Sequence, residues 1–200
     1  MICDLNTNIK DYNKKILNKF SILPFKCPKC TVKYRLIRHC YYERNVCYFS
    51  DDFNICDTKI TILRVFCKSC LSTHAILPGN IIPYKIYDER FITRILSEYY
   101  IFNKSVLSIS EEYSISYQQI YKVIKCFMFF LKSLYFVLRV VLGFIGDIYD
   151  ISGILSIINQ DPQNFCFQFF INTKWVFLMT KFKNIIPRPI YVHVHFKPPT

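Results

Sequence analysis

Two stretches in the first half of the chain have the polarity pattern of β-strands. "VKYRLIRHCYYERNV" (32–46) and "KITILRVF" (59–66) are rich in β-branched and aromatic residues, and the second roughly alternates between apolar and polar positions. The polar segment between them, "CYFSDDFNICDTK", has the composition of a hairpin tip. Pro78, Gly79 and Pro83 then mark a break. Residues 27–75 are therefore predicted to form a β-hairpin.

From Asp88 onward the apolar period becomes helical. The segment "DERFITRILSEYYIF" begins with Asp88 as a candidate N-cap, and its apolar residues recur at helical spacing: Phe91, Ile92, Ile95, Leu96 and Tyr99. Two shorter helices are expected over "SVLSISEEY" and "SYQQIYKVIKCF". Residues 126–160 are expected to form one or two apolar helices, interrupted near Gly143–Gly146. The last forty residues are aromatic, punctuated by proline and expected to end loosely.

The charge of the chain adds an expectation about its partner. The 200 residues are 52% hydrophobic, which excludes a disordered tail and suggests one domain or two small ones. The formal net charge is +12, of which residues 1–87 carry +8. Such an excess favours an anionic partner, either nucleic acid or an acidic membrane surface. An AT-rich genome, which enriches Lys, Asn, Ile, Phe and Tyr without selection for a partner, is the competing explanation.

Two Cys-x-x-Cys pairs, Cys27/Cys30 and Cys67/Cys70, are the strongest chemical signal. The first twenty residues scatter charges where a secretory signal needs an apolar core, so we expect a cytoplasmic protein whose ten cysteines stay reduced. Paired thiolates at this spacing can bind one structural Zn²⁺ tetrahedrally. Two unrelated buried or redox-active pairs are the alternative. Five other residues nearby could each replace one thiolate, although none has a partner at ligand spacing: His39, Cys40, Cys47, Cys56 and His74.

The segment "VLSISEEYSISYQQIYKVIK" fits the requirements of a helix-turn-helix. Ser110 occupies the helix crossing, Ser114 the turn, and five apolar residues face the core: Ile109, Tyr113, Ile115, Ile120 and Val123. Ser116 and Gln119 form a predicted capping box. The candidate DNA-contacting residues are Ser116, Tyr117, Gln118, Tyr121, Lys122 and Lys125. An ordinary helical hairpin in a three-helix bundle is the alternative.

Residues 20–130 also carry a family resemblance. "CPKC", "RHCYYER", "RVFCKSCLSTHAILPGNIIPY" and the three-helix segment resemble a family of uncharacterised bacterial proteins, common in clostridia and bacilli, that look like the N-terminal part of insertion-sequence transposases. The resemblance implies a zinc ribbon followed by a homeodomain-like helix-turn-helix. It further implies zinc at Cys27, Cys30, Cys67 and Cys70, and DNA contact through 116–125.

The predicted fold is thus α+β, in four segments. Residues 1–25 form a lead-in, 26–84 a small β zinc ribbon, 85–128 a homeodomain-like helix-turn-helix bundle, and 129–200 an apolar helical extension with a loosely ordered tail. No enzyme is expected. DNA strand transfer needs three carboxylates on an α/β core that hold two metal ions. The 75 residues after 125 are too few and too helical for such a core, and their three acidic residues lie close together in the sequence: Asp147, Asp150 and Asp161.

The apolar run 126–146 leaves three alternatives open. It is long enough to span a membrane, but Lys132 and Arg139 lie within it on one face. A buried helix or a homodimer helix is favoured over a membrane span or a membrane-surface helix. The chain is predicted to be a zinc-braced DNA-binding protein, transposase-like or transposase-associated. The alternative is a zinc-ribbon module that binds another protein and no DNA.

Overall fold

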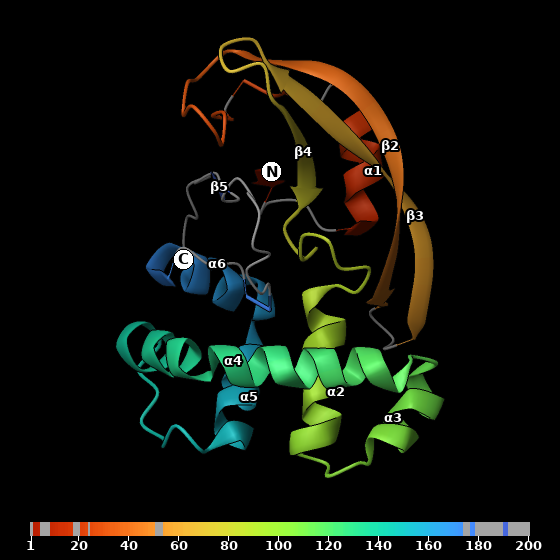
Figure 1. The fold of residues 1–200 in the computed structure, drawn as a ribbon, viewed down its shortest axis with the longest axis vertical. Helices are drawn as coiled ribbons and strands as arrows, with labels where there is room; N and C mark the ends of the chain where they lie inside the picture. The colour runs from red at the N-terminus through yellow and green to blue at the C-terminus, as the bar shows by residue number, and fades with distance from the viewer. Residues whose placement is uncertain are drawn as a thin grey trace, which may run out of the picture.

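The structure is a computed structural model of the 200-residue chain. It describes residues 2–4, 9–17, 21–23, 25–50, 54–173, 177–178 and 190–191. The strands are β1 (Ile2–Asp4), β2 (Leu36–Phe49), β3 (Ile55–Cys67), β4 (Thr73–Pro78) and β5 (Ile190–Tyr191). The helices are α1 (Ile9–Leu17), α2 (Glu89–Tyr100), α3 (Val106–Tyr113), α4 (Tyr117–Val141), α5 (Ile151–Gln160) and α6 (Pro162–Thr173). The fold is α+β, as predicted, with the sheet and α1 at one end of the molecule and α2–α6 at the other (Figure 1).

The predicted hairpin is the long curved β2–β3 pair that joins the two ends (Figure 1). It is antiparallel, with Tyr42 opposite Ile62, and a register shift between Arg38 and Cys40. β4 pairs antiparallel with β3, and the strand order is β2-β3-β4-β1-β5. β2 is the first strand in this order and so forms one edge of the sheet.

The N-terminal residues contribute to the core of the sheet. β1 pairs in parallel with β4, with Ile2 opposite Ile76. Where β4 ends, α1 covers the edge of β3: the Asn13 side chain accepts a hydrogen bond from the Thr61 backbone N–H at 2.9 Å. The Tyr12 ring is fully buried, and its hydroxyl donates to the Ile76 carbonyl. The described part of the expected lead-in therefore packs on the sheet and contains the helix α1.

The hairpin tip packs on the helical end. Phe49 stacks on Phe91 of α2 with ring centroids 5.0 Å apart, and Phe91 also meets Tyr113 of α3 edge-on. The Cys47 backbone N–H donates to the Ile86 carbonyl at 2.8 Å, which holds the segment before α2 against β2. These contacts form an apolar cluster that includes residues of α2, α3 and α4.

α2 begins at the predicted N-cap, since the Asp88 side chain accepts a hydrogen bond from the Phe91 N–H at 2.8 Å. α3 and α4 begin close to the predicted positions. α4, however, runs unbroken for 25 residues through position 128, where the sequence placed the end of the three-helix segment. The expected interruption near Gly143–Gly146 separates α4 from α5.

A second apolar cluster buries one face of α4 against α2, α5 and α6. Phe127, Leu134 and Leu138 lie on this face and are fully buried. Among the described residues, no helix has the length and apolar character needed to cross a membrane. Much of the expected loose tail lies outside the described residues.

Candidate metal centre

The two Cys-x-x-Cys pairs form two loops with the same hydrogen-bond pattern. In the first, the Cys27 N–H donates to the Val32 carbonyl at 3.1 Å, and the Thr31 N–H donates to the Cys27 carbonyl at 2.8 Å. In the second, the Cys67 N–H donates to the Ser72 carbonyl and the Leu71 N–H to the Cys67 carbonyl, both at 2.9 Å. Each loop therefore turns its paired cysteines toward the same point. We call these loops the knuckles, residues 26–35 and 67–72.

The knuckles share an unusual backbone conformation. Thr31 and Leu71, each four residues after the first cysteine of its pair, have φ of 61° and 54°. Glycine is the residue that adopts positive φ without steric cost, whereas Thr and Leu are strained there. Strain of this kind persists only where the surroundings impose it, and it concentrates at functional sites. The same strained geometry on both sides of the four sulfurs indicates that the loops are shaped around them.

The four sulfur atoms lie at the distances that a tetrahedral metal requires. Cys27 Sγ is 3.5 Å from Cys70 Sγ, Cys30 Sγ is 3.7 Å from Cys67 Sγ, and all four lie within 4.8 Å of one another. A tetrahedron with Zn–S bonds of about 2.3 Å has S···S edges of about 3.8 Å. A disulfide needs about 2.05 Å. The cysteines predicted as ligands therefore come together as one group that can hold a metal ion.

The pKa values of the clustered thiols Cys27, Cys67 and Cys70 are consistent with a site for a cation. Burial raises the pKa of the Cys27 thiol to about 12. Burial also opposes ionisation of Cys70, but hydrogen bonds from Cys27 and Ser72 outweigh it and lower the pKa of Cys70 to about 6. Backbone hydrogen bonds from Cys70 and Ser69 likewise lower the pKa of Cys67 against the effect of burial. Four thiolates this close repel one another, and a bound divalent cation would allow all four to ionise.

His74 of β4 is a neighbour of the centre that sequence reasoning did not assign. Its side chain is buried, and its Nε2 lies 3.3 Å from Cys27 Sγ. Burial lowers the pKa of His74 to about 4, so the imidazole is neutral near pH 7 and can donate Nε2–H to the sulfur. A hydrogen bond donated to a metal-binding sulfur by a neighbouring side chain helps to orient that ligand. In the sequence, His74 is marked only by its position four residues after Cys70. Its approach to the first knuckle depends on the β3–β4 register, in which His74 lies opposite Val65.

The six predicted DNA-contacting residues lie at and beyond the start of α4. All six are exposed: Ser116, Tyr117, Gln118, Tyr121, Lys122 and Lys125. Ser114 has left-handed backbone geometry, with φ 51° and ψ 40°, as expected for the turn residue. The Ser110 hydroxyl donates to the Ile115 carbonyl at 2.6 Å and so closes the turn. The five apolar residues assigned to the core are buried or partly buried there.

The predicted capping box is wrong. Ser116 occupies the N-cap of α4, but its side chain makes no capping hydrogen bond. The Gln119 side chain instead accepts a hydrogen bond from the Tyr87 hydroxyl at 2.9 Å. Gln119 therefore ties α4 to the segment before α2, and the first turn of α4 has no side-chain cap at Ser116.

Part of the chain matches a known family model. Residues 27–115 match the model of a family described as a domain of unknown function, DUF6431. No curated protein and no solved structure matches the chain. The DUF6431 match begins at the first cysteine of the metal centre and ends in the turn before α4. It includes all four cysteines and His74.

Within the matched residues 27–115, an ionic network joins α2 to α3. The buried Glu98 carboxylate pairs with Arg94 at 2.6 Å and with Lys104 at 2.8 Å, and it accepts a hydrogen bond from the Tyr113 hydroxyl at 3.0 Å. Lys104 also pairs with Glu112 of α3 at 2.6 Å. These contacts set the angle at which α3 leaves α2, and so position the turn and the start of α4.

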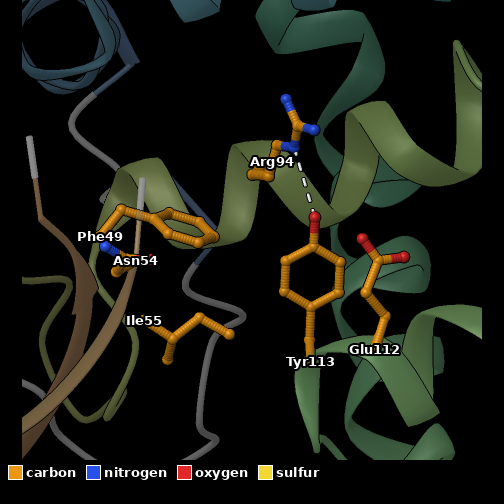
Figure 2. Close-up of a pocket in the computed structure, with 6 residues that line it drawn as sticks. All are labelled: Phe49, Asn54, Ile55, Arg94, Glu112 and Tyr113. Atoms are coloured by element: carbon orange, nitrogen blue, oxygen red, sulfur yellow. Dashed lines mark hydrogen bonds between the residues drawn. The ribbon is translucent and has the colours of Figure 1, made fainter. Parts of the chain in front are cut away.

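A cavity of about 450 Å³ opens between the hairpin tip and these helices (Figure 2). Its lining residues are Phe49, Asn54, Ile55, Arg94, Glu112 and Tyr113. Its charged groups are already engaged, because Arg94 binds Glu98 and Tyr113 while Glu112 binds Lys104. We therefore assign this cavity a structural role.

Proposed function

We propose that this chain is a zinc-braced DNA-binding protein, transposase-like or transposase-associated, in which α3, the turn and α4 act as a helix-turn-helix. The observation that supports this best is the composition of α4. Its 25 residues contain Lys122, Lys125, Lys132 and Arg139 and no acidic residue. Its first two turns project exposed side chains that suit base edges and phosphates.

The chemistry of these side chains matches that of a recognition helix. Gln118 can pair bidentately with adenine in the major groove, and Lys122 and Lys125 can neutralise phosphates. The hydroxyls of Tyr117 and Tyr121, whose residues are 55% and 56% exposed, can donate to phosphate oxygens. The N-terminus of α4, which the Ser116 side chain does not cap, favours an anion at the same place.

In this proposal the zinc ion braces the scaffold. It would link residues 27–30 to 67–70, at the end of the hairpin opposite to the helices (Figure 1). Structural zinc contributes roughly 10–16 kcal/mol to small zinc-binding peptides. Four cysteine ligands leave no position for a catalytic water. A reduced zinc–thiolate centre and a DNA partner fit the predicted cytoplasmic location.

We propose no catalytic activity for the chain. The three acidic residues that follow residue 125 have local structural roles. The Asp150 carboxylate caps α5 by accepting from the Gly153 N–H at 2.9 Å, and Asp161 accepts from the Asn164 N–H at 3.0 Å. Asp147 accepts from the Tyr149 N–H at 2.8 Å. These contacts account for each carboxylate without a shared metal.

The test is fluorescence anisotropy of the zinc-loaded chain on 40-bp duplexes between 50 and 300 mM salt. We expect log Kd to rise steeply with log salt concentration, because bound phosphates release counterions. The triple variant Gln118→Ala/Lys122→Ala/Lys125→Ala should lose at least tenfold in affinity. The variant Lys14→Ala/Lys59→Ala/Gln160→Ala removes the same charge and amide elsewhere and should bind nearly normally. Equal losses in the two variants would rule out recognition by α4.

A second candidate function follows from the other half of α4. Four apolar side chains on its outer face are exposed: Met128, Phe129, Phe136 and Val140. An apolar helix face that the described residues leave exposed favours a protein partner, including a homodimer through 126–146. Sedimentation velocity of the chain and of Phe129→Ser/Phe136→Ser tests the homodimer. A dimer that the double variant abolishes supports it, and a monomer at 100 μM contradicts it.

A further inference from the structure

Five cations gather on the knuckles. Lys26, Lys29, Lys33, Arg35 and Lys68 are all exposed, and we refer to them together as the knuckle surface. Residues 21–42 and 58–87 contain no Asp or Glu. Within the described part of the chain, none of the five pairs with a carboxylate. The knuckle surface is therefore a cationic patch without internal neutralisation.

The fold brings these charges onto one small area. The knuckles meet at the sulfurs, where Cys27 Sγ lies 3.5 Å from Cys70 Sγ. The Lys68 N–H donates to the Arg35 carbonyl at 3.0 Å, and Lys29 Nζ donates to the Ser72 hydroxyl at 3.2 Å. Five positive charges against the two negative charges of a Zn(Cys)₄ centre leave a net charge of +3. The zinc brace would thus hold mutually repelling cations together.

The knuckle surface also carries exposed side chains that a structural brace does not need. Tyr34 is 71% exposed and has φ of 60°, a strained value for a tyrosine. Leu71 at the tip of the second knuckle is 73% exposed. A tyrosine hydroxyl among lysines is a common phosphate-contacting arrangement. This composition favours a polyanion as the ligand.

The knuckle surface is distinct from the start of α4. It lies where β2 begins and β3 ends, whereas the tip of the same hairpin rests on α2 and α3 (Figure 1). A 14-residue strand has a contour length of about 45 Å. That length corresponds to roughly 13 base pairs of duplex at 3.4 Å each. A ligand that reaches both surfaces must therefore be long, as a nucleic acid is.

We propose that the knuckle surface binds the phosphate backbone of nucleic acid, as a second contact region separate from α4. The inference rests on the proposed function for the identity of the polymer, and its own evidence is the charge and geometry of the knuckles. Because backbone contacts carry no sequence information, the knuckle surface adds affinity and salt dependence without adding base specificity.

The test compares two double variants of the zinc-loaded full chain on a 40-bp random-sequence duplex. Lys33→Gln/Lys68→Gln removes two charges from the knuckle surface, and Lys14→Gln/Lys59→Gln removes two exposed charges elsewhere. Each lost phosphate contact reduces the log-log salt slope by about 0.9. We expect the knuckle variant to reduce the slope by about 2 while the control keeps it. Bound zinc, measured for both, shows that the fold is intact.

The outcomes separate this inference from the proposed function. If the α4 triple variant loses affinity and the knuckle variant keeps the full slope, the knuckle inference fails and the role of α4 stands. If only the knuckle variant loses slope, α4 recognition fails and the knuckle contact stands. A slope loss shared equally with the control variant overturns the inference, because it reports net charge alone. Binding of the same variants to phosphatidylglycerol vesicles is measured in parallel. If Lys33→Gln/Lys68→Gln loses vesicle binding while its salt slope on DNA is unchanged, the knuckle surface binds a lipid surface and the inference is overturned.

Discussion

At the scale of single residues, the surroundings of each cysteine separate the candidate metal ligands from the others. Cys27 Sγ lies 3.5 Å from Cys70 Sγ and within hydrogen-bond distance of His74 Nε2. Cys40, in contrast, is exposed on the edge strand β2 and lies outside the group of four cysteines. We expect Cys27→Ser to lose stoichiometric zinc, with a fall in affinity of at least 100-fold, because three thiolates leave the tetrahedron incomplete. Cys40→Ser should keep one zinc per chain. Metal analysis after dialysis measures both, and a zinc-replete Cys27→Ser protein would place the metal elsewhere.

Asp88 and Glu89, at the start of α2, are buried carboxylates whose ionisation opposes folding. Burial raises the pKa of Asp88 to about 7, and burial together with the Asp88 charge raises the pKa of Glu89 well above its usual range. The folded chain therefore binds more protons than the unfolded chain between about pH 4 and 7. The contribution of these two carboxyls to the free energy of unfolding is therefore most favourable below about pH 4. It becomes less favourable as the pH rises through 7.

The variant Asp88→Asn tests this pH dependence. Its amide oxygen can still accept from the Phe91 N–H, so the cap remains while the buried charge is removed. We expect a gain of roughly 2 kcal/mol in the free energy of unfolding at pH 8, a smaller gain at pH 5 and little gain at pH 4, below the pKa range over which the carboxyl ionises. Asp150→Asn makes the same change at the exposed N-cap of α5 and should leave the pH dependence unchanged. Urea unfolding at these pH values measures the two variants, and parallel curves for Asp88→Asn and the parent chain would contradict the argument.

At the scale of elements, the sequence predicted the features that depend on a few neighbouring residues. The alternation in β3, the capping Asp88 of α2 and the left-handed turn at Ser114 follow from a few neighbouring residues, and each is present. The four cysteines were predictable because their spacing is a local signal. The pairing of Ile2 with Ile76 and the approach of His74 to Cys27 depend on strand register across the molecule, which no short segment encodes. The Ser116 capping box failed because Gln119 binds Tyr87 instead.

The turn between α3 and α4 offers a prediction about backbone strain. Ser114 is exposed and has φ of 51°, a conformation that costs an L-residue about 1–2 kcal/mol and glycine little. We expect Ser114→Gly to stabilise the chain by about 0.5–1 kcal/mol, after the larger unfolded-state entropy of glycine is subtracted. Ser108→Gly, at an exposed position inside α3, should instead destabilise by about 1 kcal/mol. Thermal unfolding distinguishes the two signs, and destabilisation by both would show that the turn is not strained.

At the scale of the whole molecule, the hairpin is the mechanical link between the candidate metal centre and the helices. Its base holds Cys67, and its tip places Phe49 against Phe91 and Tyr113. The helical end has its own clusters, and the sheet end has another around Tyr12 and Leu63. The proposed zinc ion therefore acts on the helices through the strands and through their contacts near the tip, which include the aromatic contact of Phe49 and the bond from Cys47 to Ile86.

This arrangement predicts how zinc removal spreads through the chain. Chelation should increase amide hydrogen exchange in β2 and β3, and the increase should extend to α2 because Phe49 couples the two ends. In Phe49→Ala, the strands should still respond to chelation while α2 responds at least threefold less. Phe136→Ala, which truncates a phenylalanine that is 53% exposed on α4, should keep the response of the parent chain. Exchange measured by mass spectrometry resolves the segments, and an α2 response that persists in Phe49→Ala would mean that the coupling runs through other contacts, such as the bond from Cys47 to Ile86.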